Sequence, residues 1–215
     1  MREYDRDVPL VVIKRLPRYY RYLGEYLKQG ITRISSKNLS EKMGVTASQI
    51  RQDLNFFGGF GQQGYGYNIE RLYFEIGEIL GLTRGYTTII IGAGNLGHAL
   101  ANHSNFKKRG FKLVGIFDKS SDVIGTEISS LKVLDINSIA DFLKHTHVDI
   151  AILAVPKREA AEVVDRLIEL GIKGFWNFSY TDIPVPDDVA IENVHLSDGL
   201  MTLSYRLTEL SSDEK

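Results

Sequence analysis

The spacing of apolar residues differs between the first part of the chain and the rest. In the first part apolar positions recur at helical spacing and predict three helices, over residues 9–28, 36–43 and 46–57. Pro17 either kinks the first helix or opens its main segment, and Gly30 and Gly44 follow the ends of the first two. Thr46 begins the third helix in a capping-box pattern with Gln49. A helix, a glycine-containing turn and a second helix are the outline of a helix-turn-helix.

The third predicted helix has one packing face and one polar face. Ile50, Leu54 and Phe57 recur at i, i+4 and i+7 and form the packing face. The opposite stripe carries Ser, Gln, Arg and Asn, which are side chains that hydrogen-bond to base edges in a major groove. An ordinary solvated face is the alternative interpretation. The candidate DNA-reading residues are Ser48, Gln49, Arg51, Gln52 and Asn55.

The glycine-rich stretch "GGFGQQGYGY" follows this helix directly. It predicts a tight β-hairpin, which Phe60, Tyr65 and Tyr67 can anchor, and so a winged helix-turn-helix. A phosphate-binding loop is excluded because the stretch lacks a following Lys-Ser/Thr pair and a preceding buried strand. The wing is expected to lie along the DNA backbone or the adjacent minor groove. Its candidate contacts are Gln62, Gln63, Gly64 and Tyr65.

The second part of the chain opens on a dinucleotide-binding pattern. An apolar run over 88–91 leads into Gly92, Gly94 and Gly97 in G-x-G-x-x-G order, and a helix follows. A second strand ends about twenty residues later in Asp118, which is placed to accept the ribose hydroxyls of an adenosine. This carboxylate favours NAD(H) over NADP(H). The candidate cofactor contacts in these segments are Gly92, Ala93, Gly94, Asn95, Leu96, Gly97, Asp118 and Lys119.

Alternating strands and helices continue toward the C-terminus. Strands are expected over 148–155, 172–178 and near 189–196, with a helix over 158–170, and this order predicts a doubly wound parallel sheet. Ligands of such sheets bind at the carboxyl ends of the strands. The alternative to ligand contact is that residues at those strand ends serve only in packing or in turns. The candidate contacts there are Val155, Pro156, Asn177 and Phe178.

Composition and charge narrow the functional classes. The 215 residues are 43% apolar, enough to bury real cores, and no apolar run predicts a membrane span or a secretory leader, so we expect a cytoplasmic protein. The absence of cysteine excludes disulfides and thiolate metal sites, and His145 and His147 alone do not predict a metal site. Lys and Arg number 13 against 9 acidic residues before Gly85, and 13 against 18 after it. This asymmetry indicates an anionic partner for the first part.

A leucine stripe at helical spacing occupies the C-terminal segment. The sheet domain has little free surface to cover this stripe, so a partner subunit is its natural cover and a homodimer is predicted. The candidate dimer contacts are Leu196, Leu200, Leu203, Leu207 and Leu210.

The segments "TASQIRQDLNFFGGFG", "IGAGNLGHALANH", "GIKGFWNFS" and "ENVHLSDGLMTLSYRL" resemble the Rex family of bacterial redox-sensing transcriptional repressors over nearly the whole chain. The resemblance implies a winged-helix DNA-binding domain over 1–84, a Rossmann NAD(H)-binding domain over 85–195, and a C-terminal helix over 196–215 that is exchanged in a homodimer. It implies transcription regulation through an inverted-repeat, double-stranded operator, which is bound when NADH is low and released when NADH binds. It also places His103 near the nicotinamide, where the family has Tyr.

Four other positions depart from the family pattern, and two other functions compete with it. Gln52 and the wing tip Gln62-Gln63 replace basic residues, and His98 stands where Arg is frequent. A small NAD-dependent oxidoreductase is disfavoured because too few residues follow the last strand to form a substrate domain, and no acid–base pair or other catalytic residue is evident. A CoA- or nucleotide-binding regulatory module is the remaining alternative, and Asp118 argues against it.

Overall fold

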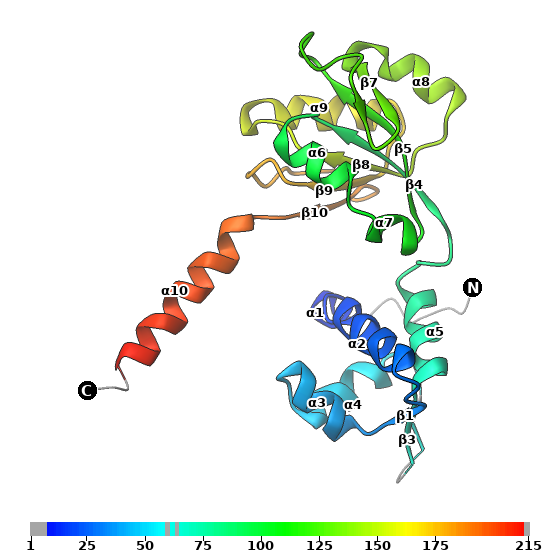
Figure 1. Cartoon of the computed structure of the whole chain (residues 1–215), viewed down its shortest axis with the longest axis vertical. Coiled ribbons are helices and arrows are strands. Elements are labelled where there is room, and N and C mark those ends of the chain that lie inside the picture. Colours follow the sequence, from blue (N-terminus) through cyan, green and yellow to red (C-terminus); the bar gives the residue numbers. More distant parts are fainter. Residues whose placement is uncertain (1–7, 59–60, 63–64, 213–215) are drawn as a thin grey trace. The chain divides into compact units, whose positions relative to one another are not determined.

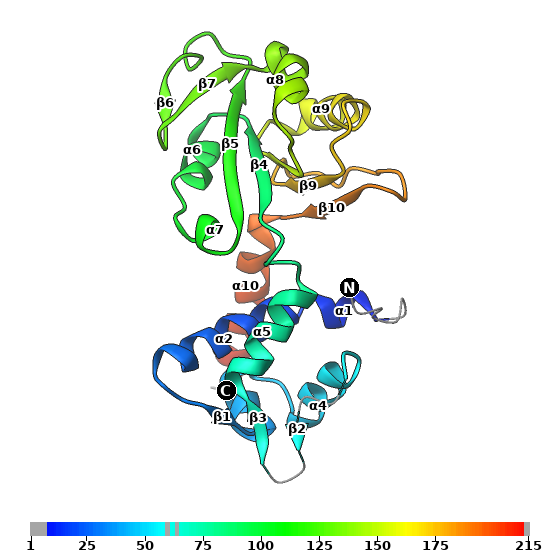
Figure 2. The same cartoon turned by 90° about the vertical axis from the view of Figure 1, so that its right-hand side faces the viewer.

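The computed structural model describes residues 8–58, 61–62 and 65–212 of the chain. The chain divides between Arg84 and Gly85 into two compact units, and each unit has its own hydrophobic core. Figure 1 and Figure 2 show the elements of both units in two views.

The N-terminal unit consists of short helices and a small sheet. Its elements are α1 Leu10–Ile13, α2 Leu16–Lys28, β1 Arg33–Ile34, α3 Ser36–Met43, α4 Ala47–Asn55, β2 Gly61–Gln62, β3 Gly66–Asn68 and α5 Ile69–Ile79. The expected first helix is two helices, and Pro17 lies in the first turn of α2, where its missing N–H breaks no helical hydrogen bond.

Local signals set the ends of the next two helices. α3 has the expected bounds, and Gly44 ends it in the left-handed conformation at φ 63°. Thr46 Oγ1 accepts a hydrogen bond from the amide of Gln49 at 3.1 Å and so caps α4. α4 ends at Asn55, two residues before the expected end at Phe57, although Phe57 is buried as expected.

Close packing of α2 against α5 organises the core of the N-terminal unit. The rings of Tyr20 and Tyr73 stack with their centroids 4.1 Å apart. A Cβ atom on Gly24 would come within 3.0 Å of the Tyr73 ring, and one on Gly77 within 3.1 Å of the Tyr20 ring. Each tyrosine therefore lies over a glycine of the opposite helix. The most buried apolar side chains around this pair include Leu16, Tyr19, Leu23, Leu39, Met43, Ile50, Leu54, Ile69, Leu72 and Ile76.

The predicted hairpin is present as part of a three-stranded antiparallel sheet of order β1-β3-β2. Strand β1 was not expected. Gly66 has φ 69°, and a Cβ there would lie 2.6 Å from the carbonyl oxygen of Ile34. Tyr67 is buried as an anchor, whereas Tyr65 is 70% exposed, so its expected anchoring role is wrong. Phe60, Gln63 and Gly64 lie outside the described residues.

The C-terminal unit contains a seven-stranded sheet of order β10-β9-β8-β4-β5-β7-β6. Its strands are β4 Tyr86–Ile91, β5 Phe111–Asp118, β6 Glu127–Ile128, β7 Leu131–Asp135, β8 Ile150–Leu153, β9 Gly174–Asn177 and β10 Ala190–Asn193. Every pair is parallel except β6–β7. The wholly parallel sheet expected from the sequence is therefore corrected at one edge, where Ser129 and Ser130 both have positive φ in a tight hairpin turn.

Helices cover both faces of this sheet, as Figure 2 shows. They are α6 Asn95–Ala101, α7 Asn105–Lys108, α8 Ile139–His145 and α9 Lys157–Glu169, with a 3-10 helix over Ile136–Ser138. Alternation along β4 sends Ile89 and Ile91 into the core beneath α8 and α9, and Ile90 into the core beneath α6. This two-sided burial is the doubly wound arrangement that the sequence predicted.

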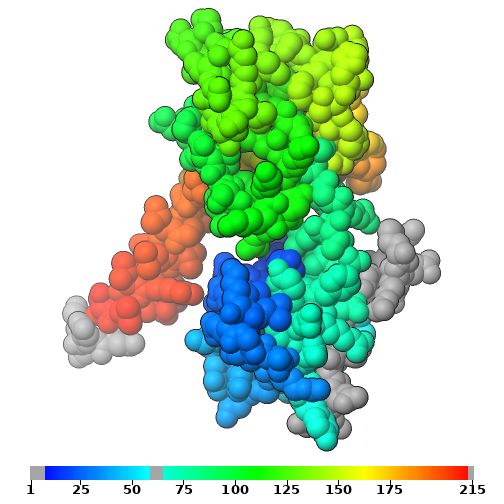
Figure 3. All heavy atoms as spheres, turned by 45° about the vertical axis from the view of Figure 1, so that its right-hand side comes forward, coloured from blue at the N-terminus to red at the C-terminus, as the bar shows by residue number. Residues whose placement is uncertain are grey.

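The C-terminal helix α10 spans Leu196–Ser212, and none of its residues is buried. Figure 3 shows its side chains at the surface of the molecule, coloured orange to red. In the part of the chain that the structure describes, no helix is long and apolar enough to cross a membrane.

Candidate functional site

The three motif glycines lie in the turn between β4 and α6, and each has a different environment. Gly92 has φ 101°, and a Cβ there would lie 2.5 Å from the carbonyl oxygen of Ala154. A Cβ on Gly97 would lie 1.8 Å from the carbonyl oxygen of Gly92. Gly94 has nothing within 4 Å of the corresponding position. The first and third glycines thus allow the chain to pack on itself, and the second leaves room for a phosphate group to approach the backbone.

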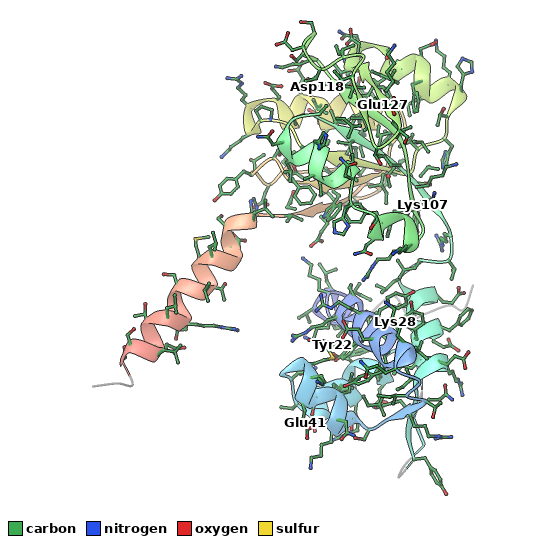
Figure 4. The ribbon with its side chains drawn as sticks, viewed as in Figure 1. Tyr22, Lys28, Glu41, Lys107, Asp118 and Glu127 are labelled. Carbon is green, nitrogen blue, oxygen red and sulfur yellow. The ribbon has the colours of Figure 1, made fainter. Side chains whose placement is uncertain are left out.

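Asp118 ends β5 beside this turn, and Figure 4 labels it. Its Oδ2 accepts a hydrogen bond from the amide of Ala93 at 2.6 Å, and its Oδ1 accepts one from the amide of Ser120 at 2.8 Å. A carboxylate has about four acceptor positions, so each oxygen can still accept a ribose hydroxyl. Half-buried Asp118 is therefore fixed against the glycine turn, and its role as the ribose acceptor stays a prediction.

Lys119, the residue after the end of β5, forms an ion pair with α9. Its Nζ lies 2.8 Å from Oε1 of Glu159 on α9. This hydrogen bond and the neighbouring Arg158 hold the pKa of Glu159 below its usual range. The pair ties the end of β5 to the start of α9, and contact of Lys119 with the cofactor stays a prediction.

The carboxyl end of β8 packs against the glycine turn. The amide of Ala154 donates to the carbonyl oxygen of Ile91, and a Cβ on Gly92 would lie 3.3 Å from the side chain of Val155. Pro156 is the N-terminal cap residue of α9 and is exposed. Both Val155 and Pro156 therefore lie at the expected edge of the sheet, next to the candidate nucleotide position.

Asn177 ends β9, and its side chain is held by internal hydrogen bonds. It is buried, and its Nδ2 donates to the Thr181 carbonyl oxygen at 2.7 Å and to Asn193 Oδ1 at 2.8 Å. Its Oδ1 accepts hydrogen bonds from both the amide and the hydroxyl of Ser179. These four bonds use the whole hydrogen-bonding capacity of the amide. The side chain joins β9, β10 and the following loop, which is the packing role given above as the alternative for this position. Contact of Asn177 with the cofactor stays a prediction.

A row of rings connects His103 with Phe178. His103 stacks on Phe106 at 4.6 Å between centroids, Phe106 lies edge-on to Trp176 at 5.5 Å, and Trp176 lies edge-on to Phe178 at 4.6 Å. The sequence reading missed Phe106 and Trp176, because neither belongs to a motif. The remaining candidates in the turn are Asn95, which is exposed, and Leu96, which is half-buried at the start of α6.

The reading face of α4 is open to solvent at most of the expected positions. The exposed members are Ser48, Arg51, Gln52 and Asn55. Arg51 donates from its two terminal nitrogens to Ser36 Oγ at 3.0 Å and to Ser48 Oγ at 3.1 Å. Gln49 is half-buried, and its Nε2 donates to Asp53 Oδ1 at 2.9 Å. Its side-chain amide thus bonds within α4, and contact of Gln49 with DNA stays a prediction.

Asp53 is fully buried on the opposite side of α4. It forms a two-pronged ion pair with Arg15 at 2.6 and 2.7 Å, and accepts a further hydrogen bond from Tyr19 Oη at 2.6 Å. Burial acts to raise the pKa of Asp53, but the bonds from Arg15, Tyr19 and Gln49 outweigh it and lower the pKa. These contacts fasten the reading helix to α2. The polar pattern of α4 is consistent with a basic partner for Asp53, but it does not identify Arg15 or Tyr19, because both are remote in the chain.

The wing and the C-terminal helix hold the remaining candidates. Gln62 lies in β2, and Tyr65 is exposed while its carbonyl oxygen accepts a hydrogen bond from Arg33 at 3.4 Å. Gln63 and Gly64 lie outside the described residues. The five leucines of the predicted dimer stripe are between 50% and 69% exposed, and they are Leu196, Leu200, Leu203, Leu207 and Leu210.

Two protein-family models match the chain. One, described as "Putative DNA-binding protein N-terminus", matches residues 7–55. The other, described as "CoA binding domain", matches residues 83–181. The two matches fall on the helix-turn-helix unit and on the sheet unit respectively.

Two curated relatives share more than half of their residues with the chain. The redox-sensing transcriptional repressor Rex of Caldanaerobacter subterraneus subsp. tengcongensis is 60% identical over 202 residues, which are 94% of this chain and 90% of the relative. The protein of the same name from Clostridioides difficile is 53% identical over 205 residues, which are 95% of this chain and 98% of the relative.

Solved structures agree with these relatives. RSP in complex with beta-NAD+ and operator DNA matches with a TM-score of 0.89 and 57% identity, over 98% of this chain and 97% of that one. RSP in complex with beta-NADH also matches with a TM-score of 0.89, at 54% identity, over 98% of this chain and 100% of that one. The resemblance found in the sequence is thereby confirmed. The chain belongs to the Rex family of redox-sensing transcriptional repressors.

Proposed function

We propose that this chain is a transcriptional repressor that responds to the ratio of NADH to NAD+. As a homodimer it binds an inverted-repeat, double-stranded operator when NADH is low, and it leaves the operator when NADH binds. The observation that carries this proposal is the presence of both parts in one chain: an exposed polar face on α4, and a glycine turn with Asp118 beside it. The relative RSP, solved with NAD+ and operator DNA and separately with NADH, supports the assignment.

The proposed ligand is NAD(H) rather than CoA, although one matching family model is named for CoA. The two free acceptor positions of Asp118 suit an adenosine ribose with both hydroxyls unmodified. A phosphorylated ribose, as in CoA or NADP(H), would bring its phosphate against this carboxylate, and like charges repel. Competition between NADH and CoA for the protein tests this choice, and CoA is expected to displace little NADH.

The proposed contacts follow from the geometry of each site. The nucleotide is proposed to lie against the glycine turn, the ends of β5 and β8 and the row of rings. Its proposed contacts are Gly92, Ala93, Gly94, Asn95, Leu96, Gly97, His103, Asp118, Val155, Pro156 and Phe178. The operator is proposed to meet Ser48, Arg51, Gln52 and Asn55 in its major groove, and Gln62 and Tyr65 of the wing along its backbone.

We propose a regulatory function without catalysis. The curated relatives are named as repressors, and control of operator binding requires only that the nucleotide bind one arrangement of the protein better than another. Within the described residues, no group of three or more His, Asp or Glu side chains could hold a metal ion. Because the proposed partner is operator DNA, the proposed place of action is the bacterial cytoplasm.

Operator selection in the presence of NAD+ or NADH tests the proposed function. Random duplexes are mixed with the full chain, and the bound fraction is recovered with each nucleotide. An inverted repeat should be recovered with NAD+ and be depleted with NADH. Recovery of the same duplexes under both conditions, or recovery of no preferred sequence, contradicts the proposal. Trp176, the single tryptophan, reports NADH binding in parallel through its fluorescence, because reduced nicotinamide absorbs where tryptophan emits.

A further inference from the structure

The guanidinium of Arg51 is held by side chains from two helices while it remains exposed. One terminal nitrogen donates to Ser36 Oγ at 3.0 Å, and the other donates to Ser48 Oγ at 3.1 Å. Ser48 lies one turn earlier on α4, whereas Ser36 is the first residue of α3. Arg51, the one arginine of the reading helix α4, is therefore held in part by a side chain of α3.

These two bonds restrict the arginine without using up its donors. An exposed arginine ordinarily samples many rotamers, and fixing them on binding costs conformational entropy. Bonds at both terminal nitrogens fix the position and the plane of the guanidinium before DNA arrives. A guanidinium has five N–H donors, so three remain, enough for a two-pronged contact with the O6 and N7 atoms of guanine.

Neighbouring hydroxyls on α3 have other partners. Ser35 Oγ accepts the amide of Asn38 as the cap of α3, and Ser40 Oγ donates to the carbonyl oxygen of Lys37. Of the hydroxyls of Ser35, Ser36 and Ser40, only that of Ser36 is hydrogen-bonded to the reading face. The cation is also close enough to β3 to oppose the rise that burial causes in the pKa of Tyr67. Arg51 thus links α4 to α3 through its guanidinium.

We propose that Ser36 is a positioning residue which, together with Ser48, orients Arg51 to read one base pair in each half of the operator. This inference rests on the proposed function. It assigns sequence discrimination to a residue outside the reading helix. The competing role for the same hydroxyl is a direct bond to a DNA phosphate, which would add affinity for every sequence alike.

Binding to operators that carry single-base-pair substitutions distinguishes positioning of Arg51 from a direct phosphate contact. Arg51→Ala first identifies the base pair at which discrimination is lost. Ser36→Ala should then reduce discrimination at that same base pair by about two- to ten-fold, the cost of ordering one long side chain on binding, and leave the other positions unchanged. Ser40→Ala is the matched control on α3 and should leave every position unchanged. Ser36→Thr, which keeps a hydroxyl, should restore discrimination.

A double-mutant comparison completes the test. In the Arg51→Ala background, Ser36→Ala should have no further effect on the binding of any operator. If Ser36→Ala instead lowered affinity equally for every operator, and did so also in the Arg51→Ala background, Ser36 would contact a phosphate. That result would overturn the proposal. Absence of any loss in Ser36→Ala, or failure of Arg51→Ala to relax any position, also overturns it. Wild-type protein that prefers no sequence would instead refute the proposed function, so the two failures are distinguishable. Unchanged NADH binding and thermal unfolding verify that the variants fold.

Discussion

At the residue scale, the aspartates Asp53 and Asp118 differ in how many hydrogen bonds their carboxylates can still accept. Asp53 accepts four hydrogen bonds from Arg15, Tyr19 and Gln49, which fill both of its oxygens. Asp118 accepts two, both from backbone amides. A carboxylate with unfilled acceptor positions next to an open turn can bind hydroxyls, whereas a filled and buried one can only join elements. Substitution of Asp118 should therefore affect NADH affinity, and substitution of Asp53 should affect stability.

Asp118→Ala should weaken NADH binding by about 1–3 kcal/mol, because charge-assisted hydrogen bonds to the ribose are lost. Operator binding without nucleotide should remain. Titration of NADH against Trp176 fluorescence measures the affinity, and Asp122→Ala, an exposed aspartate in the following loop, is the control. Unchanged affinity in Asp118→Ala would place the nucleotide elsewhere.

Asp53→Asn should destabilise the N-terminal unit by about 3–5 kcal/mol, because Arg15 would keep its charge without its partner. Urea unfolding followed by circular dichroism measures the loss. The control is Glu41→Gln on α3, labelled in Figure 4, which is exposed and should change stability little. Equal stability of Asp53→Asn and wild type would mean that the ion pair contributes nothing net.

The same carboxylate predicts a pH dependence. The pKa of Asp53 is lower in the folded chain than the value of about 3.9 expected when unfolded, so its contribution is complete above that pH and is lost as pH falls through the folded pKa. The difference in unfolding free energy between wild type and Asp53→Asn should therefore shrink as pH falls below about 4. Urea titrations at pH 7, 4 and 3 check this, and a constant difference would contradict it.

At the scale of elements, the β4–α6 turn assigns separate roles to its glycines. Gly92 and Gly97 lie against backbone atoms and allow strand and helix to approach. Gly94 faces open space with an extended backbone that any residue can adopt. A side chain at Gly92 or Gly97 would disturb the fold, and one at Gly94 would disturb only a ligand.

Gly97→Ala should lower the melting temperature and abolish NADH binding, because a Cβ would overlap the Gly92 carbonyl oxygen at 1.8 Å. Gly94→Ala should keep the wild-type melting temperature and lose NADH affinity by about tenfold or more, since its methyl group would occupy the space left for the phosphates. Thermal unfolding and NADH titration of the two variants measure both effects. Full NADH affinity in Gly94→Ala would show that the backbone there does not approach the nucleotide.

At the scale of the whole molecule, α10 exposes more apolar surface than a lone chain ordinarily retains. Its leucines form one stripe, and Met201 and Tyr205 are also exposed. A second copy would cover this surface, and an inverted-repeat operator requires two reading helices at a fixed separation. A nucleotide that favours one arrangement of the subunits would then change whether both helices can bind.

Deletion of residues 196–215 should abolish the dimer and the NADH-controlled release of the operator together. Leu203→Glu should weaken the dimer by about 2 kcal/mol or more, because it would bury a charge at the leucine stripe. Thr202→Glu, on the same helix but off the stripe, is the matched control. Light scattering and mobility-shift titration measure the two properties. A truncated protein that stays dimeric and releases its operator at the same NADH concentration would refute the coupling.

Much of the fold was predictable because its signals are local. Pro17, Gly44 and Thr46 mark helix ends through the backbone of their own neighbours, so their effects are present in the sequence itself. The glycine spacing and the position of Asp118 likewise predicted the nucleotide turn. By contrast, short strands such as β1 and β6 have too few residues to show a period, and the sheet pairing that creates them is not local.

The sequence by itself thus determined the helix-turn-helix, the doubly wound sheet and the leucine stripe, because periodicity and turn chemistry act over a few residues. Only the tertiary structure decided which polar side chains are free to bind. Asp53 meets Arg15 across 38 positions of sequence, and Asn177 meets Asn193 across 16. Hydrogen-bonding capacity is used up by neighbours in space, and a residue's neighbours in space are set by the packing of whole elements rather than by its own segment.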